Sequence, residues 1–152
     1  MHYASSNATH PYVPAVGSSM PQDDVARLLL RVTLGLLILL HGVAKLRGGL
    51  DFIAQSLSQA GLLPAFAYLV YIGEIVAPVL LLAGWWTRPA ALVVAVNMVV
   101  AVLLVHMGQL ATLAPTGGWA LELQAMFLVM ALAVALLGAG RFSLGAAHSR
   151  WN

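Results

Sequence analysis

The chain has 152 residues, of which 61% are hydrophobic and only 8% are charged, and its mean hydropathy is +0.92. A water-soluble domain of this size could not hide so much apolar surface, because a folded protein keeps much of its surface in contact with solvent. The composition therefore excludes a soluble protein and predicts an integral membrane protein with one compact domain in the lipid bilayer.

The formal net charge is only +2, and the chain contains no cysteine. Because the few basic residues are scattered, we expect no nucleic-acid partner. Without cysteine the chain can form neither disulfides nor thiolate metal ligands, so any redox role requires a bound cofactor.

Residues 1–24 are polar and contain several prolines. They lack the basic start and the apolar core of a signal peptide, so we expect a disordered N-terminal tail. The transmembrane domain is then predicted over residues 25–145, followed by a C-terminal tail at 146–152.

Four apolar segments follow the predicted N-terminal tail, and each is close to the roughly 20 residues that a helix needs to cross a membrane. They lie at about 27–47, 66–86, 89–110 and 120–140. The sequence therefore predicts an all-α fold, an integral membrane four-helix bundle. The second and third segments are joined only by Trp86-Thr87-Arg88-Pro89, which permits a tight antiparallel hairpin.

The longest connection on its side of the predicted membrane, residues 50–63, can hold a short helix. Asp51 can cap this helix and Gly61 can end it. Its apolar residues could lie on the membrane surface, which predicts a short interfacial helix between the first two membrane helices. A loop with some helix and a functional lid both stay open.

Basic residues predict the orientation of the bundle, because they are enriched on the cytoplasmic side of membrane proteins. In a four-helix arrangement most arginines fall on one side, and only Lys45 and Arg47 fall on the other. The arginines on the first side are Arg27, Arg31, Arg88, Arg141 and Arg150. We therefore expect both termini in the cytoplasm.

The first apolar segment carries three ionisable side chains. At about 100° per residue, Lys45 lies about 40° and His41 about 80° from Arg31 around the helix, so the three share one stripe. Ionisable residues in membrane helices usually face a bundle interior or a water-filled cavity. We expect this stripe to face the other helices.

Glu74 lies well inside the second apolar segment, where a lone carboxylate is costly. Pro78, four residues later, lacks the N–H that would bond to the Glu74 carbonyl, so a kink is expected there. Tyr71 lies one turn before Glu74 on the same face. Two interpretations stay open: Glu74 belongs to a functional pocket, or it pairs with Lys45 or His41 only to hold the bundle together.

Counting 1.5 Å per residue from the arginines places five polar residues from all four segments in the same half of the membrane. They are His41, Lys45, Glu74, His106 and Glu122. The two histidines could carry protons, bind a quinone oxygen or ligate haem. Haem is less favoured because their estimated depths differ, and a metal is less favoured because the Glu-x-x-His spacing of di-metal carboxylate proteins is absent.

Two amide side chains in the last two segments are also expected to make contacts between helices. Asn97 lies near mid-membrane, about 180° around its helix from His106, so we expect an interhelical hydrogen bond there. Gln124 is offset by about 200° from Glu122 and is expected to contact a neighbouring helix.

Three motifs follow one another along most of the chain. The first is Arg31-x3-Gly35-x5-His41-Gly42-x2-Lys45, the second runs from Glu74 through Leu80-Leu81-Leu82-Ala83-Gly84 to Thr87-Arg88, and the third is Gly138-Ala139-Gly140-Arg141-Phe142-Ser143-Leu144. Together they resemble the DoxX family over about residues 27–145. Gly145 departs from the pattern, because relatives commonly have an aspartate there.

This resemblance implies a multi-pass, four-helix protein of the bacterial inner membrane. The best-known members are small subunits of thiosulfate:quinone oxidoreductase, and others are linked to oxidative-stress membrane complexes. Quinone-linked redox chemistry is therefore implied, with quinone as the expected cofactor. A redox enzyme subunit and a second copy of the chain are the expected partners.

In our interpretation His41 and Glu74 exchange protons with the quinone, and Lys45 stabilises a developing oxyanion. The predicted cofactor-binding residues are Arg31, Tyr71, His106 and Glu122, and no residue is assigned to a metal. Two alternatives stay open: a non-catalytic membrane scaffold subunit of an oxidoreductase complex, and a small-molecule or proton transporter with Glu74 as the carrier.

Overall fold

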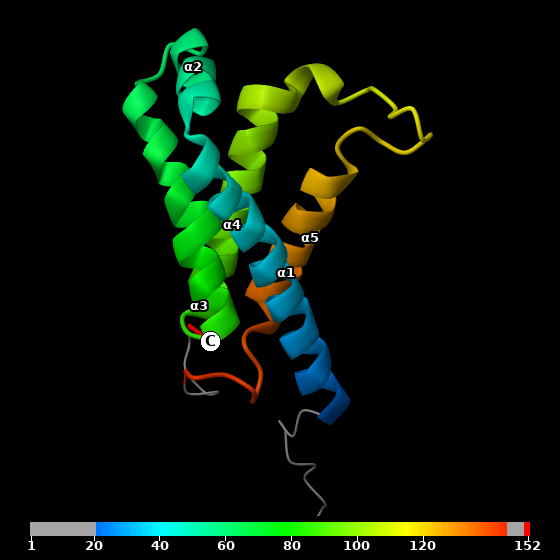
Figure 1. Ribbon diagram of the computed structural model, residues 1–152. Coiled ribbons are helices and arrows are strands. Elements are labelled where there is room, and N and C mark those ends of the chain that lie inside the picture. The colour runs from blue at the N-terminus through cyan, green and yellow to red at the C-terminus, as the bar shows by residue number, and fades with distance from the viewer. Residues whose placement is uncertain (1–20, 146–150) are drawn as a thin grey trace, which may run out of the picture.

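The computed structural model describes residues 21–145 and 151–152, and these residues form an elongated helical bundle (Figure 1). The elements in chain order are α1 (Pro21–Gly48), α2 (Asp51–Gln59), the 3-10 helix η1 (Pro64–Leu69), the π-helix η2 (Ile72–Val76), α3 (Ala77–Ala83), α4 (Thr87–Ala101), the π-helix η3 (Val102–His106), the 3-10 helix η4 (Met107–Gln109) and α5 (Glu122–Leu137). The predicted all-α fold is confirmed for this part of the chain.

Three continuous helical segments are long and apolar enough to cross a membrane. They are Pro21–Gly48, Pro64–Ala83 and Thr87–Gln109. The fourth predicted segment is helical over only 16 residues, Glu122–Leu137, which span about 24 Å. It ends there because Gly138 adopts a φ of +77°, which glycine tolerates and a helix does not. Whether α5 crosses the membrane stays a prediction.

The first helix begins earlier than the sequence predicted. α1 starts at Pro21, so residues 21–24 are a helical turn and not part of a disordered tail. Asp23 and Asp24 lie in that turn, where carboxylates interact favourably with the positive end of the helix dipole. The rest of the predicted N-terminal tail, residues 1–20, and residues 146–150 of the predicted C-terminal tail lie outside the described residues.

The short helix predicted between the first two membrane helices is α2. Its N-cap is Leu50, and no side chain of the described residues caps it. Asp51 lies inside the first turn, so it favours the helix through the dipole and does not cap it as predicted. The interfacial position of α2 stays a prediction.

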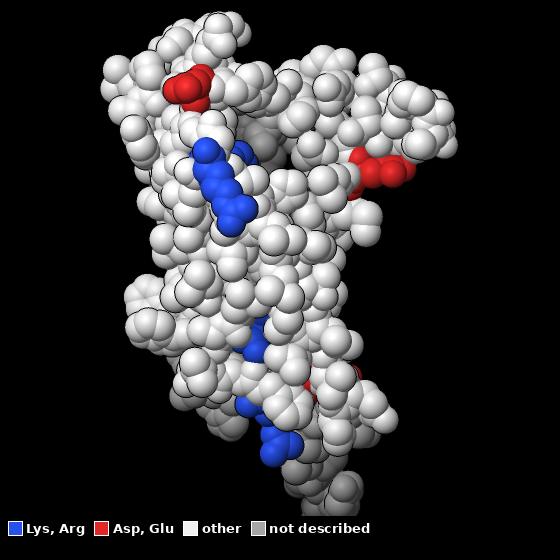
Figure 2. All heavy atoms as spheres, in the orientation of Figure 1, with Lys and Arg blue, Asp and Glu red and all other residues white. Residues whose placement is uncertain are grey.

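Small side chains let the helices pack closely, and α4 makes its most extensive contact with α5. Ala91 and Ala131 are fully buried in the common core, where alanine allows close helix approach. Leu40, Val96 and Val129 point outward and are more than half exposed, as suits helices surrounded by lipid. Figure 2 shows the middle of one face as largely uncharged, with charged side chains gathered toward its two ends.

Candidate ligand-binding pocket

The irregularity predicted before Pro78 is the π-helix η2, which contains Glu74. Pro78 has no N–H to bond with the Glu74 carbonyl, and π-turns are frequent at functional sites. α1 packs directly on this carbonyl, since a Cβ placed on Gly42 would lie only 2.2 Å from the Glu74 oxygen. Gly42 therefore lets α1 come close enough for Lys45, one turn later, to reach the Glu74 side chain.

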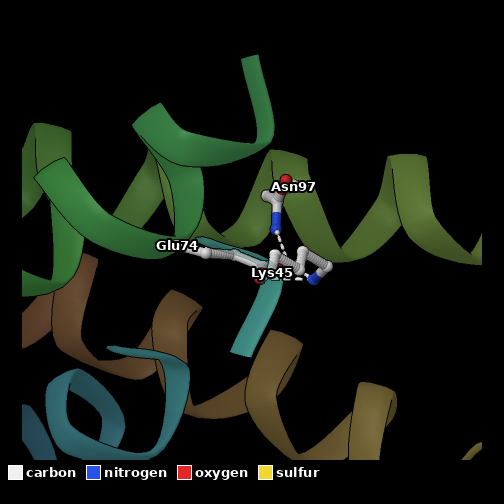
Figure 3. A network of polar contacts seen from close by, with 3 residues as sticks. All are labelled: Lys45, Glu74 and Asn97. Carbon is white, nitrogen blue, oxygen red and sulfur yellow. Dashed lines mark hydrogen bonds and ion pairs between the residues drawn. The ribbon is translucent and has the colours of Figure 1, made fainter. Parts of the chain in front are cut away.

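Glu74 is the centre of a buried polar network (Figure 3). The Lys45 ammonium forms an ion pair with the Glu74 carboxylate, and the two side chains are 29% and 6% exposed. Asn97 Nδ2, on α4, donates a hydrogen bond of 3.2 Å to Glu74 Oε1. A buried carboxylate needs such partners to offset its loss of water. The interhelical hydrogen bond predicted for Asn97 is confirmed, and so is the contact that the packing interpretation of Glu74 required.

A cavity of about 140 Å³ lies beside this network. Its polar lining consists of His41, Lys45, Glu74, His106 and Gln124, and its apolar lining includes Phe127 and Met98. An apolar cavity of roughly 150 Å³ holds a benzene molecule, so this space suits one six-membered ring. Figure 2 shows a hollow toward the upper end of the bundle with a basic side chain at its edge.

The two histidines reach this cavity from different helices. The His41 ring packs edge-on against Phe127, with ring centroids 5.9 Å apart. His106 Nδ1 lies 3.1 Å from Gln109 Oε1, and His106 Nε2 lies 3.3 Å from Gln124 Nε2. An imidazole placed between these two amides can donate through Nδ1–H to the Gln109 oxygen and accept at Nε2 from the Gln124 amide. The contact predicted for Gln124 with a neighbouring element is confirmed.

Three of the predicted site residues lie elsewhere. Glu122 is exposed, and its Oε1 accepts a hydrogen bond of 2.9 Å from the Trp119 N–H. The Tyr71 ring lies 6.3 Å from the Tyr68 ring and does not line the cavity. Arg31 is buried and donates to the carbonyl oxygens of Leu81 and Phe142.

The structure therefore brings together His41, Lys45, Glu74 and His106, and leaves Arg31 in a separate network. Asn97, Gln124 and Phe127 were not among the predicted site residues, although an amide inside an apolar segment signals a buried partner. Within the described ranges no group of three or more His, Asp or Glu side chains could hold a metal ion.

Comparison with known proteins adds one finding. No curated protein and no solved structure matches the chain significantly. The family model of DoxX matches residues 26–107, which is more than half of the 152 residues. The match extends from α1 to η4 and includes Lys45, Glu74 and His106, whereas α5 lies beyond it. The chain therefore belongs to the DoxX family.

Proposed function

We propose that this DoxX membrane protein binds a quinone-type ring inside its helix bundle, as a membrane subunit of an oxidoreductase. One observation carries the proposal: a ring-sized cavity of about 140 Å³ has a lysine–carboxylate pair and two histidines in its wall. A pocket with apolar walls and a few converging polar groups is the usual form of a small-molecule site.

A quinone supplies two-electron carrier chemistry in which its two ring oxygens gain or lose protons. Lys45 would donate a hydrogen bond to a ring oxygen and stabilise negative charge on it. Glu74 and His41 would exchange protons with that oxygen, because both side chains line the same cavity. Phe127 and Met98, which line the cavity, would contact the ring and exclude water.

The chain itself contains no cysteine, and in our proposal the electrons come from a partner enzyme. A role as a quinone-binding subunit therefore fits better than a role as a complete enzyme. The partner would dock at the membrane surface near the cavity.

We further propose that the protein resides in the bacterial inner membrane with α5 as a fourth crossing helix. α5 packs along α4 and α1, which supports this arrangement. Arg27, Arg31 and Arg88 would then lie near the cytoplasm and the cavity would lie nearer the opposite side, as the positive-inside rule favours.

The test is a calorimetric titration of detergent-purified protein with 2,3-dimethoxy-5-methyl-1,4-benzoquinone, a quinone ring without a tail. We expect saturable binding that weakens at least about tenfold in Glu74→Gln and in Lys45→Met, because each loses a charged contact. Asp23→Asn and Arg47→Gln are the matched controls, since they change exposed charges on α1 outside the cavity. Folded protein that binds no quinone, or that binds it equally in all variants, would overturn the proposal and favour the scaffold subunit.

A further inference from the structure

We propose that an apolar hollow next to the cavity holds the hydrocarbon tail of the ligand, with the Gln124 side chain as the movable wall between the two spaces. This inference rests on the proposed function and narrows the ligand to lipid-soluble quinones that carry an isoprenoid or alkyl tail. A tailless quinone would fill only the cavity.

The hollow has a volume of about 180 Å³ and lies between α5 and the consecutive helices α4 and η3. Its walls include Val99, Val102, Leu103 and Leu128, and the ring of Trp119 also lines it. The indole Nε1 of Trp119 already donates a hydrogen bond of 2.9 Å to the Leu110 carbonyl, so its ring offers the hollow an apolar surface. Such walls suit a hydrocarbon chain and no polar group.

The hollow and the cavity share one side chain, Gln124. Its amide nitrogen makes a single long hydrogen bond of 3.3 Å to His106. Its oxygen Oε1 is buried, and no described residue donates a hydrogen bond to it. A buried oxygen without a partner destabilises the position it occupies. Rotation of the Gln124 side chain therefore breaks only this one long hydrogen bond, and it would connect the two spaces.

A larger apolar groove of about 530 Å³ is the competing place for a tail. It lies against α2, η1, η2, α4 and η3, but it shares no described lining residue with the cavity. Gly73 lines this groove and Glu74 lines the cavity, so the backbone of η2 stands between them. The hydrogen bond from Asn97 to Glu74 closes the same route.

The experiment compares two ligands in three proteins by calorimetry in detergent. The ligands are the tailless dimethoxy-methyl-benzoquinone and its decyl derivative. The proteins are the wild type, Val99→Trp, which fills the hollow, and Val96→Trp, which fills the larger groove. The two substitutions are matched, because both place the same side chain at an exposed valine of α4. The ratio of the two dissociation constants measures the contribution of the tail, and partition into micelles affects all three proteins equally.

We expect the tail to tighten binding to the wild type, because it makes additional apolar contacts with the walls of the hollow. Val99→Trp should reduce this advantage at least about tenfold, and Val96→Trp should leave it within about twofold. An advantage lost only in Val96→Trp, lost in both variants or kept in both would overturn the inference and leave the ring site intact. If the wild type binds neither ligand, the proposed function itself fails.

Discussion

The two ends of the bundle use their cationic side chains in opposite ways. At one end, which we call the arginine end, Arg27, Arg31 and Arg88 donate hydrogen bonds to main-chain carbonyl oxygens. At the other end, Lys45 pairs with the carboxylate of Glu74 beside a cavity. The first arrangement satisfies the chain's own backbone, and the second leaves charged groups next to a space that a ligand can fill.

The carbonyls at the arginine end belong to the last turns of two helices. Arg31 Nη1 lies 2.9 Å from the Leu81 oxygen of α3, and Arg27 Nη1 lies 2.9 Å from the Leu137 oxygen of α5. Carbonyls in the last turn of a helix have no partner within the helix, and cations there also interact favourably with the helix dipole. These arginines therefore complete the fold, and we expect their loss to affect stability more than ligand binding.

The largest expected effect is that of Arg31→Met, which removes the hydrogen bonds to Leu81 and Phe142. The Phe142 carbonyl would lose this donor, and the Leu81 carbonyl would keep only the Gly84 N–H at 3.1 Å. Because a hydrogen bond from a charged donor contributes roughly 1.5–3 kcal/mol, we expect a loss of about 3 kcal/mol of unfolding free energy. Thermal unfolding in detergent measures it, and Arg141→Met, at an exposed arginine, is the control. A variant that keeps its stability and loses quinone affinity would instead make Arg31 the cofactor-binding residue that the sequence predicted.

Gly84→Ala disturbs the same Arg31 hydrogen bonds from the end of α3, where Gly84 lies next to the guanidinium group. Gly84 has a φ of +66°, and a Cβ there would lie 2.0 Å from Arg31 Nη1. We expect a loss of roughly 2–3 kcal/mol, partly from backbone strain and partly from displacement of Arg31.

Gly61→Ala separates these two causes. Gly61 also has a positive φ, +74°, but no described residue lies within 4 Å of a Cβ placed there. Its replacement should cost only the backbone strain, about 1 kcal/mol. Equal losses of unfolding free energy in the two variants would show that Gly84 is needed for its φ alone and not for the space that Arg31 occupies.

The two ends of the bundle also differ in how much of their structure the sequence predicts. Hydropathy located three membrane-length helices and the short helix at Asp51, and depth counting placed His41, Lys45, Glu74 and His106 in one neighbourhood. These estimates need only the rise per residue and the length of an apolar segment. Both are set by local chemistry, so one sequence is enough for them.

Contacts between individual side chains could not be predicted from one segment, because they depend on how two helices are placed relative to each other. The Glu74–Asn97 hydrogen bond depends on the relative rotation of η2 and α4, and a π-turn changes the phase of a helix by about one residue, or about 100°. Arg31 shares a stripe with Lys45 on an ideal helix, yet it meets the end of α3 and not the cavity. Its partners are main-chain carbonyl oxygens, and the spacing of side chains along the sequence does not predict where these oxygens lie.

At the cavity end, Lys45→Met should cost about 2 kcal/mol of stability, because it strands the buried carboxylate of Glu74. The double variant Lys45→Met/Glu74→Met should be more stable than the sum of its two single changes predicts, by about 1–2 kcal/mol, since no charge is left unpaired. Denaturant unfolding of all four proteins gives this coupling energy.

Binding of the tailless quinone to the double variant then sharpens the contrast with the arginine end. We expect stability to recover and quinone binding to stay lost, because the pair is kept for its chemistry and not for its contribution to folding. Recovery of both would mean that Lys45 and Glu74 only hold the bundle together, as the packing interpretation has it.

The smallest expected effect is that of Asn97→Leu. It removes one neutral amide donor from Glu74 Oε1 while Lys45 still contacts the carboxylate, so we expect a loss of about 1 kcal/mol of stability. Quinone affinity should fall by roughly threefold to tenfold, because the carboxylate is held by one element fewer.

Gln55→Leu is the matched control, since it removes an exposed amide on α2 away from the cavity, and it should change stability by less than about 0.5 kcal/mol. If Asn97→Leu weakens binding no more than Gln55→Leu does, Lys45 alone orients Glu74. The amide of Asn97 would then serve the packing of α4 against η2, and the cavity end would share at this position the structural character of the arginine end.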